Sequence, residues 1–398
     1  MNHCHPDASH VCAFRMKYFA EVLARRGHRV VLLTETLKID HPGSELSQLD
    51  TLIKNHDWAN PFPILVKPMF ESKLFSLRKQ KLSFGFRQGI ILKRYLFNNG
   101  MFNHWTQSAE KYFGVLESKI RPDIIWATFG NTDCWNIAQN ISKAINVPWV
   151  ADIKDNWDAF IPLGLSKLVA SRFNSMAGMT AFSNAHRVLA KKVFNRDAKV
   201  IYSGFANNSV NEKIIKIDKK ILITGSLYNS KFLKQILING IISWIENQKR
   251  GSNRIEVHYA GNDVSFFKEA SKGLLDYCNI AIDSFLPLDL LQKLQASAWV
   301  NAYIYNERSL FQHKTIELMA ARRPIIAIPE EATEVLSISE SIEANLCPCH
   351  SADIVARTLE NLNNNYQSSG DVSKVLKYSW EEQSKKLEKF LELKKGVL

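Results

Sequence analysis

The sequence predicts an α/β protein built from two halves, each a parallel sheet covered by helices. Three observations lead to this prediction. The chain has 398 residues, which is more than one hydrophobic core usually supports. Short runs rich in β-branched residues alternate with amphipathic stretches at helical spacing along nearly the whole chain. A turn-rich and lysine-rich segment at 203–220 interrupts this alternation, which then starts again.

The composition is that of an ordinary globular protein. Hydrophobic residues make up 46% of the chain and charged residues 23%, which argues against disorder. No run approaches the ~18 apolar residues that span a bilayer, and the N-terminus lacks the apolar core of a signal peptide. The formal net charge of +12 favours an anionic partner, such as a nucleotide phosphate or an acidic membrane surface. We expect no nucleic-acid partner, because no DNA- or RNA-binding signature accompanies the charge.

The cysteines favour a reducing compartment. All six are scattered without the spacing of a disulfide framework, so reduced thiols in a cytoplasmic protein are the simplest interpretation. Histidines and cysteines also gather near the start of the chain, at His3, Cys4, His5, His10 and Cys12. Their spacing fits no closed structural zinc site, so we expect no metal there.

The first half begins with a predicted helix over 14–25, ended by Gly27, and a buried strand at 29–34. A doubly wound sheet would place another parallel strand before this helix, but residues 1–12 read as the loop that follows such a strand. We therefore expect the first strand of this sheet to be missing, which would leave two edges unpaired. The hypothesis is that the chain as given starts late. An in-frame stop codon directly before Met1 would contradict it.

A basic amphipathic stretch follows at 71–97, after a short predicted strand at 63–67. Seven lysines and arginines alternate there with aromatic and aliphatic residues, and Glu71 alone opposes their charge. A helix of this kind can lie on anionic lipid, where each basic residue adds about 1 kcal/mol. The alternative is a helical insertion packed on its own domain with a solvated basic face. The sequence does not decide between them.

Polar residues follow two later strands of the first half. A predicted strand at 122–128 enters the polar loop 129–133, and a strand at 148–151 runs into Asp152 and Asp155. Carboxylates just beyond a strand end are placed to act as a general base or to hold acceptor hydroxyls. Asp155 is the better catalytic candidate, because it lies further beyond the strand. The alternative is a loop stabilised by Asx turns.

The second half repeats the β/α pattern after the linker. A strand at 221–224 ends at Gly225 and Ser226, with Lys231 shortly after and a helix predicted over 232–246. A glycine at such a turn lets backbone N–H groups approach a phosphate closely. The next strand, at 255–260, ends in the same way at Gly261. By itself a single glycine turn is weak evidence for a phosphate site.

The stretch 299–328 has the clearest pattern of the chain. It predicts a strand, a polar loop, a helix that ends before Pro324, and a second strand. Lys314 and Glu317 lie three residues apart near the helix start and share one face. In open α/β sheets this position binds phosphate, so Lys314 would neutralise a phosphate and Glu317 would accept hydrogen bonds from ribose hydroxyls. The alternative is an exposed ion pair worth a few tenths of a kcal/mol.

Two α/β halves followed by a charged helix at 379–395 indicate twin Rossmann-like domains facing a cleft. In addition, the chain resembles the retaining glycosyltransferases of the GT-B fold, in the GT4-like group, over nearly its whole length. The expected boundaries are 1–203, 204–376, and a helix at 377–398 that crosses back to the first domain. The resemblance is carried by stretches in family order: 23–30 (LARRGHRV), 148–157 (PWVADIKDNW), 199–205 (KVIYSGF), 223–225 (ITG), 314–317 (KTIE) with Pro324, and 378–382 (YSWEE).

The resemblance implies transfer of a hexosyl unit from a nucleoside-diphosphate sugar, bound mainly by the second domain. Glu317 would hold the ribose, and Lys314 and Lys231 would face the diphosphate with the backbone at Gly225. The acceptor would lie near Asp152, Asp155 and the loop containing Asn131. Many relatives build cell-envelope polysaccharide or lipid-linked glycans, which would suit a cytoplasmic enzyme on the inner face of the membrane. No cofactor and no metal is expected if lysines neutralise the diphosphate, and the sequence has no Asp-x-Asp metal motif.

Two departures from the family pattern qualify the resemblance. Many relatives have a second glutamate eight residues before the ribose-binding one, where this chain has Ser309. This favours the subgroup with the Lys-x-x-Glu motif and leaves the donor-sugar contacts open. The missing first strand puts the activity of the chain as given in doubt. The alternatives are a nucleotide-sugar 2-epimerase of the same architecture and a non-catalytic relative that binds glycan or membrane.

Overall fold

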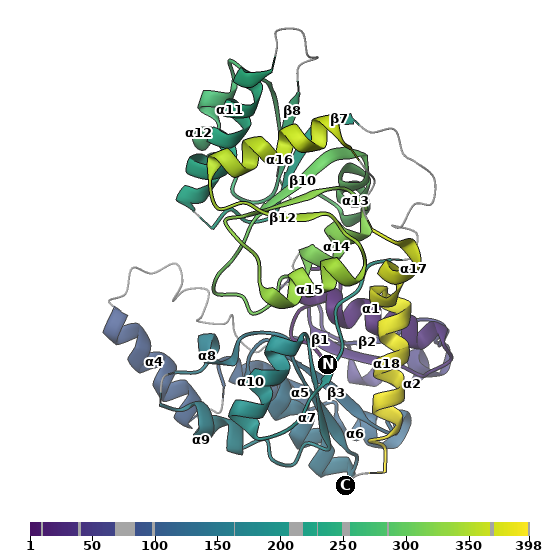
Figure 1. Ribbon diagram of the computed structural model, residues 1–398. Coiled ribbons are helices and arrows are strands. Elements are labelled where there is room, and N and C mark those ends of the chain that lie inside the picture. The colour runs from purple at the N-terminus through teal and green to yellow at the C-terminus, as the bar shows by residue number, and fades with distance from the viewer. Residues whose placement is uncertain are drawn as a thin grey trace. The chain divides into compact units, whose positions relative to one another are not determined.

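A computed structural model describes residues 1–8, 11–38, 41–67, 84–97, 100–162, 164–206, 218–228, 230–248, 255–284, 286–366 and 370–396 (Figure 1). The chain divides into two compact units. The first comprises Met1–Ser203 together with Trp380–Leu398, and the second comprises Gly204–Ser379. Both are α/β units with parallel sheets. The linker predicted at 203–220 lies largely outside the described residues.

The second unit contains a six-stranded sheet in which every pair of neighbours is parallel. Its spatial order is β12-β11-β10-β7-β8-β9. The chain therefore builds outward from β7 in one direction, then returns to the middle and builds outward from β10 in the other. This is the Rossmann order, and its switch point lies between β7 and β10. The strands are β7 (Asp218–Thr224), β8 (Glu256–Ala260), β9 (Asn279–Asp283), β10 (Ala298–Ile304), β11 (Ile325–Ile328) and β12 (Leu346–Pro348).

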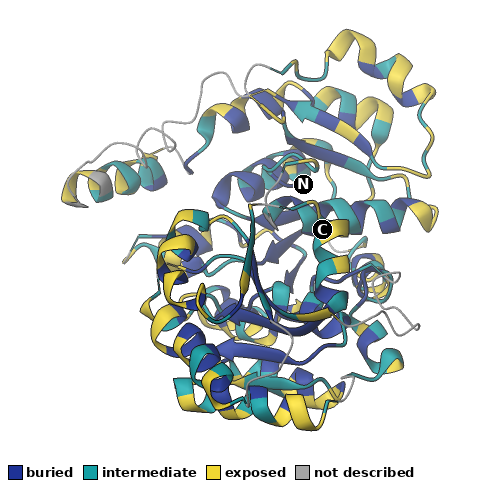
Figure 2. Ribbon diagram, turned by 90° about the horizontal axis from the view of Figure 1, so that it is seen from above, coloured by how far each residue is buried: buried dark blue, intermediate teal, exposed yellow. Residues whose placement is uncertain are grey.

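Strand β7 is covered on both faces, which explains its continuous apolar run. Ile221 and Ile223 pack in the large core cluster with residues of α11 (Asn239–Asn247) and α16 (Ala352–Asn364). Leu222 packs in a different cluster with residues of α13 (Leu288–Ser297). Successive side chains of a strand point to opposite faces, so helices on both sides require apolar residues at every position. Figure 2 shows the strands mostly buried and the outer helix faces exposed.

The remaining helices of the second unit connect these strands. The helix predicted over 232–246 is a π-helix, η3, that continues into α11. Helix α14 begins at Lys314, as the pattern predicted. The others follow in chain order: η3 (Leu233–Ile238), α12 (Val264–Ala270), η4 (Lys272–Leu274), α14 (Lys314–Ala320), α15 (Thr333–Ser341), α17 (Val372–Val375) and η5 (Leu376–Tyr378).

The first unit has two separate parallel sheets. One pairs β1 (Val31–Glu35) with β2 (Phe62–Val66). The other has the order β3-β4-β5-β6, with β3 (Ile125–Phe129), β4 (Trp149–Ile153), β5 (Gly178–Ala181) and β6 (Lys199–Val200). The first residues of the chain lie between the two sheets. The amino group of Met1 donates to the Trp126 carbonyl at 2.6 Å, and the N–H of Asn2 donates to the Leu33 carbonyl at 3.3 Å.

Residues 1–8 form neither a helix nor a strand, as expected of a loop. Residues 1–3 nevertheless hydrogen-bond to both β1 and β3. Helix α1 begins at Val11, three residues earlier than predicted. The sequence pattern did not show the contacts of residues 1–3, because these contacts depend on the two strands on either side.

The helices of the first unit include one from the far end of the chain. The ring of Trp380, at the start of α18 (Trp380–Glu392), stacks on Tyr18 of α1 (Val11–Arg25) at 5.0 Å. Figure 1 shows α18 in yellow alongside α1 in purple. The other helices are α2 (Leu46–Lys54), α4 (Phe84–Phe97), α5 (Asn103–Glu110), α6 (Phe113–Val115), η1 (Leu116–Ile120), α7 (Thr132–Ile145), α8 (Trp157–Phe160), α9 (Ser166–Ser171) and α10 (Asn184–Phe194).

Only part of the basic stretch 71–97 can be compared with its prediction. Residues 68–83 lie outside the described residues, and the described part is α4. Phe86 and Phe97 on this helix are 62% and 77% exposed, which is unusual for phenylalanine. Among the described residues, no helix is long and apolar enough to cross a bilayer.

Candidate functional site

The switch point of the second unit brings a glycine turn and a lysine together. Strand β7 ends at Thr224, and the chain turns at Gly225 with a φ of +84°, a left-handed conformation that favours glycine. Helix α14 starts with Lys314, after the loop that follows β10. A Cβ atom added to Gly225 would lie 3.4 Å from Lys314 Nζ. Two of the predicted donor-binding residues thus meet at the carboxyl ends of β7 and β10.

The ammonium group of Lys314 is enclosed without a counter-ion. Lys314 Nζ donates to the Ile304 carbonyl at 3.2 Å and lies 4.7 Å from the centre of the Tyr303 ring. In the described part of the chain, no carboxylate oxygen lies within 4.0 Å of it. Burial lowers the pKa of Lys314 to about 7, with the charge of Glu331 opposing the shift. Burial therefore disfavours the charged form of this amine, and an anion bound beside it would favour that form.

Glu331 and Tyr303 complete the surroundings of Lys314, and sequence reasoning missed both. The Tyr303 hydroxyl donates to the Glu331 carboxylate, which also accepts from the N–H of Ala332 at 2.7 Å. Burial raises the pKa of Glu331. Their sequence signal was weak, because Tyr303 reads as a core strand residue and Glu331 as a polar loop residue.

Glu317 lies one turn further along α14. Its side chain is 12% exposed, and its nearest ionisable neighbour is His313, with Nε2 at 3.9 Å from Oε1. Burial raises the pKa of Glu317, while His313 opposes the shift. His313 Nε2 itself lies 2.8 Å from the Gly204 carbonyl. No hydrogen bond to the Glu317 carboxylate is found within the described ranges, so both oxygens are available to hydroxyl groups.

Ser226 and Gly261 shape the turn after β7. Ser226 Oγ donates to Asp263 Oδ2 at 2.8 Å, and the N–H of Leu227 donates to the same oxygen at 2.6 Å. A Cβ on Gly261 would lie 2.5 Å from the Gly225 carbonyl oxygen, so only glycine fits there without a shift. The Tyr259 hydroxyl donates to that same carbonyl at 3.0 Å. Ser226 and Gly261 therefore hold the turn in place, and Asp263, which sequence reasoning missed, fixes it.

Among the described residues, no contact links Lys231 to the turn at Gly225 or to Lys314. It is exposed, and its Nζ lies 5.8 Å from the ring of Phe232. Its predicted role towards a diphosphate stays a prediction.

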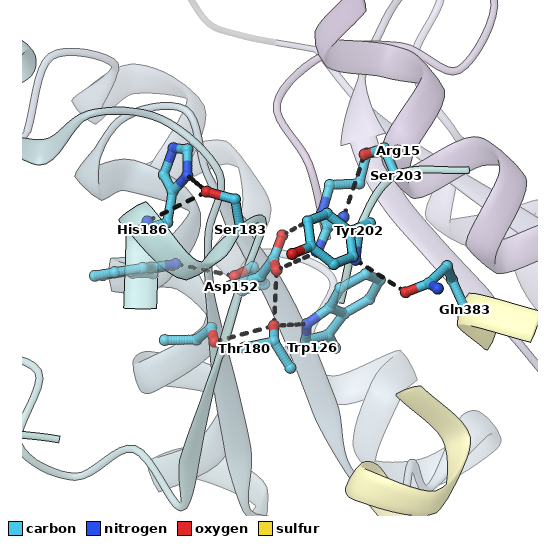
Figure 3. Close-up of polar contacts among 12 residues, drawn as sticks. Arg15, Trp126, Asp152, Thr180, Ser183, His186, Tyr202, Ser203 and Gln383 are labelled. Carbon is cyan, nitrogen blue, oxygen red and sulfur yellow. Dashed lines mark hydrogen bonds and ion pairs between the residues drawn. The ribbon is translucent and has the colours of Figure 1, made fainter. Parts of the chain in front are cut away.

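The first unit contains a buried ion pair that the sequence did not reveal (Figure 3). Arg15 Nε and Nη2 donate to the two oxygens of Asp152 at 2.9 and 2.8 Å. The Thr180 hydroxyl donates to Asp152 Oδ1 at 2.7 Å, and Arg15 Nη1 donates to Ser203 Oγ at 3.2 Å. Arg15 and Asp152 are both buried. The Asp152 carboxylate is therefore occupied by interactions that hold α1 to β4 and β5, and its expected acceptor role stays a prediction.

Figure 3 also shows the groups that surround this pair. The Trp126 indole donates to Thr180 Oγ1 at 2.9 Å, and the N–H of Tyr202 donates to Gln383 of α18 at 3.0 Å. His186 Nδ1 lies 2.8 Å from Ser183 Oγ. Burial, together with the charge of Arg15, lowers the pKa of His186 to about 3, so this histidine is neutral at physiological pH.

Asp155 is more accessible than Asp152. Its side chain is 29% exposed and accepts from Lys154 Nζ at 2.8 Å. Lys154 Nζ also lies 3.1 Å from Cys12 Sγ. Burial raises the pKa of Asp155, and Lys154 opposes the shift. A carboxylate with a raised pKa that is open on one side is placed for general-base chemistry.

Asn131 caps α7 and keeps part of its amide unused. Its Oδ1 accepts from the N–H of Asp133 at 2.8 Å. Its Nδ2 is buried and has no hydrogen-bond partner among the described residues. Burial raises the pKa of Asp133 to about 6, although the N–H groups of Met101 and Phe102 donate to its carboxylate. Asp133 belongs to the polar loop 129–133 that the sequence indicated, whereas Glu35, whose pKa burial raises to about 8, was not singled out.

The histidines and cysteines at the N-terminus form no recognisable metal centre in the described residues. No group of three or more His, Cys, Asp or Glu side chains there could hold a metal ion. His10 lies outside the described residues. All six cysteines are free thiols.

Comparisons with known proteins agree on the architecture. No protein-family model matches the chain, and no curated protein matches its sequence. Solved structures do match over nearly the whole length. HepE of Anabaena, in complex with UDP and glucose, has a TM-score of 0.60 at 12% identity, covering 99% of this chain and 98% of that chain. The fold is that of the GT-B class.

Two further GT-B structures show how widely this architecture is used. A glycosyltransferase from Rickettsia africae has a TM-score of 0.62 at 14% identity, covering 97% of this chain and 94% of that chain. A UDP-N-acetylglucosamine 2-epimerase, so described for Listeria monocytogenes, has a TM-score of 0.56 at 11% identity, covering 95% and 92%. Identities this low support the fold alone. The expectation of an α/β fold with two Rossmann-like domains of the GT-B class is confirmed.

Proposed function

We propose that the protein is a retaining glycosyltransferase of the GT4-like, Lys-x-x-Glu subgroup. It would move a hexosyl unit from a nucleoside-diphosphate sugar to a glycan or lipid-linked acceptor. The observation that carries the proposal is the enclosed Lys314 ammonium, which faces the left-handed turn at Gly225 and has no carboxylate partner among the described residues. A diphosphate supplies the missing negative charge at the position where Rossmann sheets bind nucleotides.

The chemistry assigned to the second unit is stabilisation of the leaving group. As the sugar departs, negative charge grows on the diphosphate. Lys314 would stabilise this charge, because the Ile304 carbonyl holds its ammonium group in place before the reaction begins. Glu317 would accept hydrogen bonds from the ribose hydroxyls, since its carboxylate has no such bonds among the described residues. In this proposal Lys314 takes the role that a metal ion has in other transferases.

In the first unit, the proposal assigns the acceptor to Asp155 and Asn131. Asp155 is partly exposed and has a raised pKa, which suits acceptance of a proton from an acceptor hydroxyl. Asn131 has a buried amide donor without a partner in the described chain, which suits a hydrogen bond to a glycan oxygen. Asp152 is left out, because Arg15 and Thr180 occupy its oxygens.

The test of the function is a turnover assay with a panel of nucleoside-diphosphate sugars. Uridine nucleotides come first, because UDP is bound in the HepE structure. We expect release of the nucleoside diphosphate only when an acceptor extract is present. Conversion of the sugar without acceptor, followed by NMR, would identify a 2-epimerase, the alternative that the Listeria structure favours. Nucleotide binding without turnover on any acceptor would indicate a non-catalytic relative.

The polysaccharide pathway and the membrane surface belong to this proposal as well. Support comes from α4, which exposes Phe86 and Phe97 beside Lys93 and Arg94. We expect the protein to co-sediment with vesicles containing phosphatidylserine, and less so with neutral vesicles. The double variant Phe86→Ser/Phe97→Ser should lose most of this binding, while Leu168→Ser, which removes an exposed leucine on α9, should not. Equal sedimentation of all three proteins would refute the membrane role of α4.

A further inference from the structure

Two cysteines of the first unit lie beside a buried lysine. Cys12 Sγ is 3.1 Å from Lys154 Nζ, and the thiols of Cys4 and Cys12 share a hydrogen bond. Both cysteines are partly exposed, whereas Lys154 is buried. The metal interpretation and the proposed transfer chemistry leave both thiols without a role, although they form one cluster with the ammonium group.

Hydrogen bonds to the backbone hold both cysteines in this position. The Thr34 hydroxyl of β1 donates to the Cys4 carbonyl at 2.7 Å. The Asn2 amide donates to the Cys12 carbonyl, also at 2.7 Å, in the first turn of α1. Cysteines can form a disulfide only when their Cα atoms lie within about 7 Å of each other. Because both residues are anchored, the approach of the two thiols is a property of the fold.

Lys154 gives Cys12 the surroundings of a reactive cysteine. The nucleophile in cysteine chemistry is the thiolate, which a neighbouring ammonium group stabilises. Although burial lowers it, the charges of Asp155 and Cys12 raise the pKa of Lys154 overall, so the ammonium form persists at physiological pH. Asp155 accepts a hydrogen bond from the same ammonium group at 2.8 Å. Lys154 therefore serves two anionic groups, and Cys12 is the thiol that it contacts.

Cys4 has the properties of a second, resolving thiol. A hydrogen bond to Cys12, together with burial, raises the pKa of the Cys4 thiol, so Cys4 keeps its proton and donates it to the Cys12 sulfur. His3 Nε2 lies 3.3 Å from Cys4 Sγ. When a thiolate is oxidised beside a second thiol, the sulfenic acid condenses with that thiol to a disulfide. The two cysteines thus differ in role, because Cys12 contacts the ammonium group and Cys4 holds a proton.

We propose that Cys4 and Cys12 form a peroxide-reactive dithiol site, in which Cys12 is oxidised first and Cys4 closes the disulfide. The Cys12 thiolate attacks one oxygen of hydrogen peroxide and the O–O bond breaks. The departing hydroxide takes a proton from solvent, which leaves Cys12 as a sulfenic acid. The Cys4 sulfur then attacks the Cys12 sulfur, the S–O bond breaks, and hydroxide leaves as water with the proton of the Cys4 thiol. One peroxide is thus reduced to two waters while two thiols are oxidised to one disulfide.

Oxidation of this pair changes the surroundings of Asp155, and the importance of this change for catalysis rests on the proposed function. Burial raises the pKa of Asp155, Lys154 opposes the shift, and the negative charge of Cys12 adds to it. A disulfide carries no charge, so the contribution of Cys12 is lost and the pKa of Asp155 falls. The carboxylate becomes a weaker base, which links the redox state of the two thiols to the acceptor chemistry proposed for the first unit.

The experiment follows the thiols of the reduced full chain after treatment with hydrogen peroxide. Trypsin releases Cys4 and Cys12 in one peptide, residues 1–15, so mass spectrometry after alkylation shows whether the pair is linked. We expect this peptide to lose two hydrogen atoms and to take up no alkyl group. In Cys4→Ser the reaction should stop at the sulfenic acid of Cys12, which dimedone traps. In Cys12→Ser no dimedone adduct should form at Cys4.

Cys347 and Lys167 provide matched controls. Cys347 is also partly exposed, but burial raises its pKa to about 11, so iodoacetamide should alkylate Cys12 at least ~10-fold faster than Cys347 at neutral pH. Lys154→Gln should remove this difference, while Lys167→Gln, a change at an exposed lysine on α9, should keep it.

The proposal would be overturned if Cys12 reacted no faster than Cys347 in the parent chain. It would also be overturned if peroxide linked cysteines of different copies instead of Cys4 and Cys12. Both readouts use the parent chain, so they do not depend on the folding of any variant. Neither requires turnover, so they are independent of the proposed transferase activity.

Discussion

Replacement of Lys314 by methionine is expected to weaken binding of a nucleoside diphosphate by about 10- to 100-fold. The lysine is the cation that faces the turn at Gly225, and hydrogen bonds to charged groups are worth about 1.5–3 kcal/mol. Isothermal titration calorimetry with UDP as the first ligand measures the change. Sugar transfer should fall by at least tenfold, and Glu317→Ala should cause a similar loss, because the ribose hydroxyls lose their acceptor.

The same Lys314→Met variant should be more stable than the parent protein without ligand. In the folded protein the pKa of Lys314 is lowered from 10.5 to about 7 by burial. Folding therefore disfavours the charged form of Lys314. The full loss of unfolding free energy is present below pH 7, where the amine is charged in both the folded and the unfolded state. This cost disappears as the pH rises from about 7 towards 10.5. A higher melting temperature at pH 6 and a shrinking difference above pH 7 would show that binding was lost without damage to the fold.

The pH dependence of nucleotide binding distinguishes the effect of the Lys314 charge from the effect of its side-chain shape. Lys314 is protonated below about pH 7, so nucleotide affinity of the parent protein should fall as the pH rises through this value. Lys314→Arg keeps a positive charge at every accessible pH, so its affinity should vary less with pH. Lys268→Ala, a change at an exposed lysine on α12, serves as the control. Unchanged affinity in Lys314→Met would remove the basis of the proposed function.

Replacement of Asp152 by alanine is expected to destabilise the first unit by about 3–5 kcal/mol. The change leaves the guanidinium of Arg15 buried without its carboxylate, which is the most damaging way to break a buried pair. It also removes the acceptor of the Thr180 hydroxyl. Urea denaturation, followed by tryptophan fluorescence, measures the loss, since Trp126 lies within this network.

Two further variants test whether the unpaired charge of Arg15 causes the loss of stability in Asp152→Ala. The double variant Arg15→Met/Asp152→Leu removes both charges and should recover much of the lost stability, because apolar replacements of buried pairs are often tolerated. Asp158→Ala removes an exposed carboxylate near Lys192 and should change stability little, as surface pairs contribute little. A loss of less than ~1 kcal/mol in Asp152→Ala would show that the pair is not needed for folding.

The sequence predicted those parts of the fold that depend on local pattern. Strand β8 and the start of α14 were placed within about a residue, because burial on both faces produces a continuous apolar run and a helix start changes that pattern. Lys314 and Glu317 were singled out for the same reason, since their spacing along one helix is a local property, and their roles stay predictions.

The features that were missed depend on contacts between distant parts of the chain. Arg15 and Asp152 are 137 positions apart, and a lone arginine on an apolar helix face gives no sign of its partner. Tyr259 and Asp263 support the turn at Gly225 from the neighbouring strand, and both read as ordinary strand and loop residues. Asp152 was assigned to the acceptor because its position beyond a strand was visible, whereas its ion pair was not.

The placement of α18 has a consequence for the order in which the protein is made. The first unit needs residues from both ends of the chain, since Trp380 stacks on Tyr18 and Glu388 accepts from Arg26. During translation, residues 204–379 leave the ribosome before α18 does. The second unit is therefore complete while the first still lacks its last helix, although the first began to emerge earlier. The nascent N-terminal half must remain partly exposed until the final residues are synthesised, which makes it the half that depends more on chaperones.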